Sequence, residues 1–180
     1  MRSSFSTTRA CLTRTWSAKS TAASKCAAAA GEFGDFELAA NALGVCDAAV
    51  ENAMQFARSE RRGGKLLYEH QLVQLKLNEM HALTEALRSY VLRTGWEMDH
   101  KVQGVNAVLV MNYSTTVIQR VTELNMDIHG GSGLEMDAYA EKLVRDAMIW
   151  THLAGDSVTR MKAIQHFLKP HALPSEVTPA

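Results

Sequence analysis

The sequence predicts an all-α fold, an antiparallel up-and-down helical bundle of four to five helices. Apolar residues recur at steps of three and four over residues 67–99, which is the spacing of one helix face. Two glycine-rich stretches, "RRGGK" and "HGGSG", interrupt the helical pattern at points where helices commonly end. No convincing strand pattern occurs from Asp35 onward, so long amphipathic helices joined by short turns are expected.

The first two predicted helices flank the stretch "RRGGK". The first covers about residues 35–62, with Asp35 as its N-cap and Gly63 and Gly64 following a cationic last turn. The second covers about residues 67–99 and has the strongest apolar stripe in the chain. The members of this stripe are Val73, Leu77, Met80, Thr84, Leu87 and Val91.

The third and fourth predicted helices flank the second glycine-rich stretch. The third covers about residues 103–126, and the fourth about residues 138–153. A fifth covers about residues 156–168 and ends before Pro170. The apolar face of the third helix consists of Val105, Leu109, Val117, Val121 and Leu124.

The N-terminal segment differs in composition from the rest of the chain. Residues 1–31 are rich in Ser, Thr and Ala and carry no acid, and their cations are Arg2, Arg9, Arg14, Lys19 and Lys25. This profile is typical of a mitochondrial or plastid transit peptide. A disordered tail, or a start codon misassigned ahead of a truncated gene, is the alternative. A transit peptide would imply the mitochondrial matrix, and the cytoplasm is expected otherwise.

Three segments are therefore predicted: a disordered or transit-peptide-like tail (1–33), a helical domain (34–169) and a frayed tail (170–180). The charge of +5 on residues 1–31 leaves −5 for the remainder of a neutral chain, which argues against nucleic acid as the main partner. No apolar run reaches about 18 residues, so no membrane span is expected. The cysteines form no CxxC pair, which argues against a zinc site and a disulfide framework.

Metal and nucleophile chemistry find little support in the sequence. Glu97 and His100 form one Glu-x-x-His pair, whereas di-iron bundles use two such pairs on facing helices. The stretch "HGGSG" lacks the strand–turn–helix context of an oxyanion-hole motif. No metal is therefore expected.

The stretch "DIHGGSGL", residues 127–134, has three glycines, which cost backbone entropy on folding. Glycine amides that precede a helix can point several N–H groups at one anion, and His129 would add a donor. A turn that only ends a helix is the alternative, and spacing alone leaves both open.

Three blocks of the sequence resemble the C-terminal helical domain of the acyl-CoA dehydrogenase family. They are "ALGVCDAAVENAMQFARSERRGGKLLYEHQLVQLKLNEM", "DIHGGSGL" and "AEKLVRDAMIWTHLAGDS", and they occur in the family's order. The resemblance assigns residues 34–169 to that domain. It implies an FAD-dependent oxidoreductase of fatty acid metabolism that acts on the CH–CH bond of an acyl-CoA thioester, in a homo-oligomer (a dimer or tetramer).

The resemblance also implies which residues contact FAD. In the family the glycine turn lies against the adenosine-diphosphate part of the cofactor, usually that of a neighbouring subunit. The expected cofactor-binding residues are Arg61, Gln71, His129, Gly130, Gly131, Gly133 and Asp156.

Two departures concern the FAD pyrophosphate. The position of the family's FAD-binding arginine is Glu60, so the neighbouring Arg61 is expected to replace it. The glutamine before the glycine turn is Asp127, which places a second acid near phosphate.

A third departure concerns the catalytic base. The family's glutamate, which removes the α-proton of the thioester, corresponds to Ala154, and alanine cannot accept a proton. Asp156 and Glu37 are the candidate replacement bases, although a displaced carboxylate seldom keeps productive geometry.

Two functions remain open. The chain is expected to represent the C-terminal domain of an acyl-CoA dehydrogenase-type flavoprotein, because the family's members are longer and carry an N-terminal helical domain and a β domain. The alternative is a non-catalytic helical subunit or paralogue that binds FAD or partner subunits and lacks the base.

Overall fold

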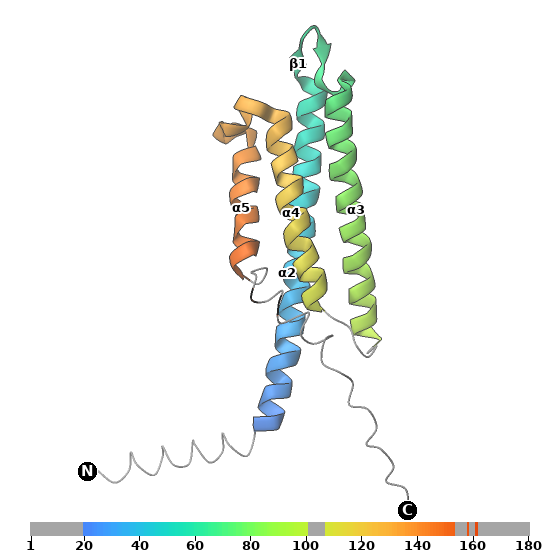
Figure 1. Cartoon of the computed structure of the whole chain (residues 1–180), viewed down its shortest axis with the longest axis vertical. Helices are drawn as coiled ribbons and strands as arrows, with labels where there is room; N and C mark the ends of the chain where they lie inside the picture. Colours follow the sequence, from blue (N-terminus) through green and yellow to red (C-terminus); the bar gives the residue numbers. More distant parts are fainter. Residues whose placement is uncertain (1–19, 101–106, 154–157, 159–160, 162–180) are drawn as a thin grey trace, which may run out of the picture. The chain divides into compact units, whose positions relative to one another are not determined.

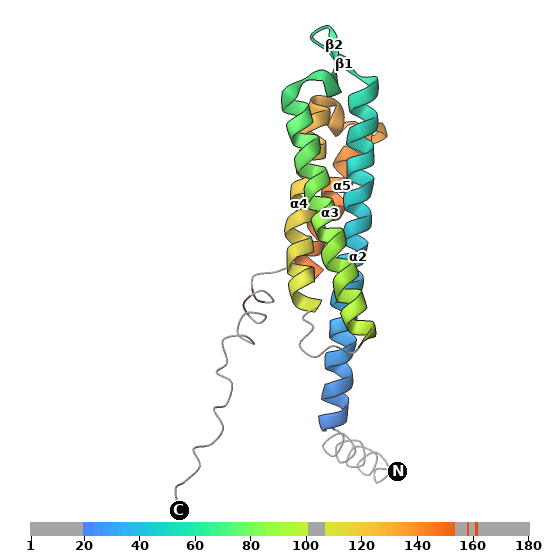
Figure 2. The same cartoon turned by 90° about the vertical axis from the view of Figure 1, so that its right-hand side faces the viewer.

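The computed structural model describes residues 20–100 and 107–153 with residues 158 and 161, and side chains from Phe33 onward. The chain divides into two units, Met1–Gly34 and Asp35–Ala180. Four helices pack together in the second unit, which confirms the predicted all-α fold (Figures 1 and 2). In the part of the chain that is described, no helix is both long and apolar enough to cross a bilayer.

The elements alternate in direction along the bundle. Consecutive helices run antiparallel, so that α2 and α4 run in one direction and α3 and α5 in the other (Figure 1). The order is α2 (Ser20–Ser59), β1 (Arg61–Arg62), β2 (Lys65–Leu66), η1 (Leu67–Glu69), α3 (Gln71–Asp99), α4 (Ala107–His129), η2 (Gly130–Leu134), η3 (Met136–Ala138) and α5 (Ala140–Leu153).

The start of α2 differs from the prediction. The helix begins at Ser20 rather than at Asp35. Residues 20–31 are rich in alanine, the residue with the highest helix propensity, and no proline interrupts them. The predicted helix start at Asp35 was therefore wrong, because residues 20–33 are already helical. The assignment of residues 1–33 to a tail or a transit peptide stays a prediction.

The stretch "RRGGK" forms a short β-hairpin, so the expectation that the chain has no strand was wrong here. Arg61 pairs with Leu66 and Arg62 with Lys65. The two loop residues, Gly63 and Gly64, have φ of +59° and +84°. Positive φ at both positions of a two-residue loop fits a turn whose twist matches the paired strands, and glycine adopts it without steric cost.

Two other predictions lie partly or wholly outside the described residues. The first is the start of the third predicted helix near residue 103, which lies outside the described residues. The end of this helix is described: it is His129 and not the predicted Met126. The fifth helix, residues 156–168, is the other; Ala154 and Asp156 also lie outside the described residues.

The core is built on a stripe of small residues on α2. Small side chains let neighbouring helices approach α2 closely, and larger residues of α3 and α4 complete the cluster. The α2 members are Ala39, Ala42, Cys46, Ala49 and Ala53, all with no exposed surface. Burial raises the pKa of the Cys46 thiol to about 12, so it stays protonated.

Helix α4 lies at the centre of the bundle. It buries thirteen residues, on most sides of the helix, including Ser114, Thr115, Thr122 and Asn125. The three hydroxyls donate to carbonyls of their own helix, for example Thr115 Oγ1 to Met111 O at 3.0 Å. Because α4 contacts its neighbours all along its length, its C-terminal end is held in place, and the glycine turn that follows His129 is held with it.

Candidate cofactor-binding site

One end of the bundle gathers most of the predicted cofactor-binding residues. The end of α2, the hairpin, the start of α3 and the glycine turn after α4 all meet there (Figure 1). The rings of Phe56 on α2 and His129 on α4 stack with their centroids 4.1 Å apart. Asn52 Nδ2 donates to Ala138 O at 3.1 Å, which ties the segment after the turn to α2. Arg61, Gln71, Gly130 and Gly131 thus share this end.

The glycine turn is a direct continuation of α4. Residues Gly130–Leu134 form a 3₁₀ helix, in which N–H groups donate to carbonyls three residues earlier. The N–H of Glu135 ends the turn by donating to Ser132 O at 3.1 Å. Bonds of this kind use amides of the turn within the chain. The expected set of glycine N–H groups that point at one anion stays a prediction.

The three glycines of the turn have different structural reasons. Gly130 has a φ of +59°, which favours glycine whatever surrounds it. An added Cβ at Gly133 would lie 2.6 Å from Met126 Sδ and 2.9 Å from His129 Cβ, so packing within the chain requires a glycine there. Gly131 has neither reason, because its φ is not positive and nothing described lies within 4 Å of an added Cβ.

The side chain of His129 points into the bundle. It is 5% exposed, and its Nδ1 lies 2.9 Å from Asn125 O, which as a carbonyl can only accept. Nδ1 therefore carries the proton, and the neutral ring packs on Phe56. Burial lowers the pKa of His129 below its usual value, despite the hydrogen bond to Asn125. The imidazole anchors the turn to α2, with its Nδ1–H already used.

The lowered pKa of His129 makes stability depend on pH. The unfolded histidine takes up a proton below about pH 6.5, whereas the folded one resists protonation. The free energy of unfolding is expected to be level above that pH and to fall as the pH drops towards the folded pKa, by up to about 1.4 kcal/mol per pH unit. Urea unfolding between pH 8 and pH 5 measures this slope. His129→Leu should flatten it, and an unchanged slope in this variant would contradict the prediction.

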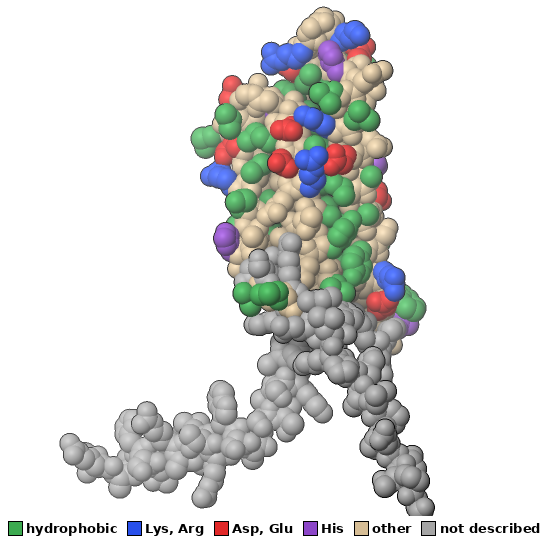
Figure 3. All heavy atoms as spheres, in the orientation of Figure 1, with side chains coloured by type: hydrophobic (Ala, Val, Ile, Leu, Met, Phe, Trp, Pro, Cys, Tyr) green, Lys and Arg blue, Asp and Glu red, His purple; other side chains and the backbone are tan. Residues whose placement is uncertain are grey.

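Arg61 and Gln71 lie on either side of the hairpin. Arg61 is exposed in β1 and has no ion-pair partner among the described residues, so its charge is available to a ligand. Gln71 is exposed as the first residue of α3, where backbone N–H groups lack helical partners. Figure 3 shows basic side chains gathered around the hairpin.

The two acids that depart from the family pattern are both paired. Glu60 Oε1 lies 2.9 Å from Arg62 Nη2, and Asp127 Oδ2 lies 3.2 Å from Lys76 Nζ. Their partners offset part of the repulsion towards a phosphate, but exposed pairs are weak and screened by salt.

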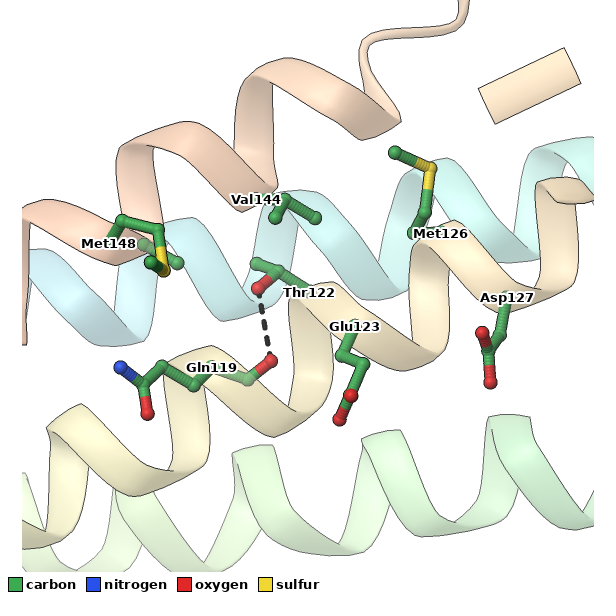
Figure 4. Close-up of a pocket in the computed structure, with 8 residues that line it drawn as sticks. Gln119, Thr122, Glu123, Met126, Asp127, Val144 and Met148 are labelled. Atoms are coloured by element: carbon green, nitrogen blue, oxygen red, sulfur yellow. Dashed lines mark hydrogen bonds between the residues drawn. The ribbon is translucent and has the colours of Figure 1, made fainter. Parts of the chain in front are cut away.

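Two recesses open beside this end of the bundle. One, of about 440 Å³, lies between α2 and the start of α3, and its polar groups come from Arg58, Tyr68 and Gln74. The other, of about 420 Å³, lies between α4 and α5. Figure 4 shows Met126, Val144 and Met148 around this second recess, which ends next to Asp127.

The candidate base Glu37 lies at the opposite end of the bundle. It is exposed on α2, next to Leu38, whose carbonyl accepts a hydrogen bond of 2.9 Å from Trp150 Nε1. Trp150 is in the last turn of α5, just before Ala154 in the chain. Helix α5 has 14 residues and a length of about 21 Å, so Glu37 is far from the glycine turn.

The sequence prediction missed Phe56, Asn52 and Asn125 as parts of the site's support. A signal existed for Asn125, a polar residue at a core position between Val121 and Ile128. For Asn52 the sequence has no such signal, because its contact with Ala138 joins residues far apart in the chain.

Comparison with known proteins supports the assignment of the chain. A family model described as acyl-CoA dehydrogenase, C-terminal domain, matches residues 32–168. The short-chain specific acyl-CoA dehydrogenase of Megasphaera elsdenii is 30% identical over 117 residues, 64% of this chain and 30% of that protein. The 3-(aryl)acrylate reductase of Clostridium sporogenes is 29% identical over 139 residues, 76% of this chain and 37% of that protein.

Comparison with solved structures supports the same family assignment. The solved structure of butyryl-CoA dehydrogenase from Megasphaera elsdenii superposes with a TM-score of 0.72 at 26% identity, covering 77% of this chain and 37% of that one. The chain thus spans about a third of the length of the curated relatives it matches. It belongs to the acyl-CoA dehydrogenase family, whose C-terminal domain it resembles throughout residues 32–168.

Proposed function

We propose that this chain is the C-terminal domain of an FAD-dependent oxidoreductase that acts on the CH–CH bond of an acyl-CoA thioester. The observation that supports this best is Gly131, an exposed glycine for which the described part of the chain gives no internal reason. An external group that approaches the backbone closely would supply one. The family is FAD-dependent, and its cofactor is the natural candidate.

The residues at the hairpin end fit the diphosphate of FAD. The guanidinium of Arg61 would pair with a phosphate oxygen, and the amide of Gln71 would donate to the cofactor. Gly130 and Gly131 would let the diphosphate approach the turn, which His129 holds in place from within. When bound, the flavin supplies the acceptor for a hydride from the substrate, and a separate acceptor takes the electrons onward.

The opposite end of the bundle would serve proton removal. Ala154 occupies the position of the usual base, so Asp156 or Glu37 is the candidate group. Because this end and the glycine turn are separated by the length of α5, about 21 Å, one chain would contribute to two cofactor sites in a homo-oligomer (a dimer or tetramer).

Glu60→Arg is expected to tighten FAD binding about tenfold. The substitution replaces an acid near the proposed diphosphate site by a cation and releases Arg62 from its pair. Flavin fluorescence titration of the chain at physiological salt would measure the dissociation constant.

Glu51→Arg is the matched control for this titration. Glu51 is an exposed acid on α2, the helix that ends at Ser59 just before Glu60. It lies nine residues or about 13 Å earlier, a distance at which salt screens most of the interaction between exposed charges. Equal effects of the two substitutions would attribute the gain to net charge. No FAD binding by either form of a folded chain would contradict the proposal.

A non-catalytic helical subunit is the second candidate, and the alanine at position 154 favours it. In that case the protein isolated with its flavin should leave an added acyl-CoA unchanged, whereas Ala154→Glu should allow bleaching of the flavin absorbance. Bleaching by the natural protein at a similar rate would show that another base acts, and would remove this candidate.

A further inference from the structure

Two asparagines with buried side-chain atoms lie one turn below the stacked rings of Phe56 and His129. Asn125 on α4 has no exposed surface, and neither Nδ2 nor Oδ1 has a hydrogen-bond partner among the described residues. Asn52 on α2 uses its Nδ2 to donate to Ala138 O, while its buried Oδ1 has no partner there. Buried amide groups in proteins are nearly always paired, so three such atoms in one region require a partner.

The stacked rings place the two asparagines at the same level of the bundle. Helices α2 and α4 run in the same direction, and Phe56 and His129 stack across them at 4.1 Å. Asn52 and Asn125 are each four residues earlier, which moves both by about 6 Å along parallel axes. Both side chains therefore lie at the same level of the bundle, in the layer one turn below the stacked rings.

We propose that this layer is a binding site for one buried water molecule. A water has two donors and two acceptor lone pairs, which match the unpaired atoms. It would donate to Asn52 Oδ1 and Asn125 Oδ1 and accept from Asn125 Nδ2. Three hydrogen bonds are typical of buried water in proteins.

The proposed water would also help to position the glycine turn, because both asparagines make hydrogen bonds to residues beside it. The backbone carbonyl of Asn125 accepts from His129 at the start of the turn, and the side chain of Asn52 donates to Ala138 O after it. A water that joins the two amides would connect the anchors on both sides of the turn. It positions the turn whether or not the turn binds FAD.

The buried hydroxyls of α4 provide the contrast. Thr115 and Thr122 are equally buried, and each donates to a carbonyl four residues earlier in its own helix. They need no further partner, because a hydroxyl can reach that carbonyl. The polar atoms of Asn125 make no such bond, so they need a partner other than their own helix.

A crystal structure of the full chain tests the site directly. It should contain one ordered water within about 3.2 Å of Asn52 Oδ1 and of both polar atoms of Asn125. A direct hydrogen bond between the two asparagines, or a layer without water, would overturn the proposal. This readout does not depend on any variant being able to fold.

Hydrogen exchange tests the positioning role. Asn125→Leu removes the partners of the water and should raise amide exchange in residues 132–140 about tenfold relative to the middle of α3. Thr115→Val, which removes a buried hydroxyl from the same helix, should change that ratio less than about twofold. Equal changes in the two variants would show that the asparagine has no special effect on the turn.

Discussion

Leu87→Ala is expected to lower the free energy of unfolding by about 2–5 kcal/mol. Leu87 has no exposed surface and belongs to the main core cluster, in which α3 packs on α4. The substitution removes three carbon atoms and leaves a cavity that the rigid neighbouring helices cannot fill completely. Chemical denaturation with urea, followed by circular dichroism, would give the change.

Leu92→Ala is the matched control for this prediction. Leu92 lies on the same helix and is 66% exposed, so the same loss of atoms should cost less than about 0.5 kcal/mol. If both variants lost the same stability, α3 would not present the face that the bundle requires.

This pair shows how much of the fold is encoded locally. The stripe through Leu77, Met80, Leu87 and Val91 predicts the buried face of α3, because one period of 3.6 residues places them all on one side. The packing of four helices follows from the short connections between such stripes. Both parts of the prediction are confirmed.

The helix ends were less predictable, because the same residues fit more than one local structure. Gly63 and Gly64 stop a helix equally well as a left-handed cap or as the loop of a hairpin. The choice depends on whether Arg61 and Leu66 pair across the loop, which is a contact between segments. The alanine-rich start of α2 was excluded on composition alone, although alanine favours a helix.

The candidate site was predicted only in part for the same reason. The glycine run marked the right segment of the chain, but the direction of the His129 ring depends on Phe56, which lies 73 positions earlier in the numbering. The contact of Asn52 with Ala138 is equally long-range. Which glycine serves packing and which one faces outward depends on neighbours such as Met126 and Ala140.

Gly133→Ala is expected to lower the stability of the fold, whereas Gly131→Ala, the same change two residues earlier, should leave it unchanged. An added methyl group at Gly133 would come within 2.9 Å of His129 Cβ, an atom fixed by the buried ring. The neighbouring atoms must shift, and the free energy of unfolding should fall by about 1–3 kcal/mol, as for other overpacked cores. At Gly131 the methyl group meets nothing described within 4 Å, so stability should stay within about 0.5 kcal/mol.

Affinity for FAD should instead be affected by Gly131→Ala, the variant that keeps its stability. If the diphosphate rests against the turn, the methyl group of Gly131→Ala occupies the space of closest approach, and the dissociation constant for FAD should rise about tenfold, or 1.4 kcal/mol. Thermal unfolding with and without FAD measures both properties in one series, because a ligand that binds the folded state raises its midpoint. A Gly131→Ala variant that keeps both its stability and its affinity would show that this glycine has no cofactor role. The turn would then only end α4 and lead into α5.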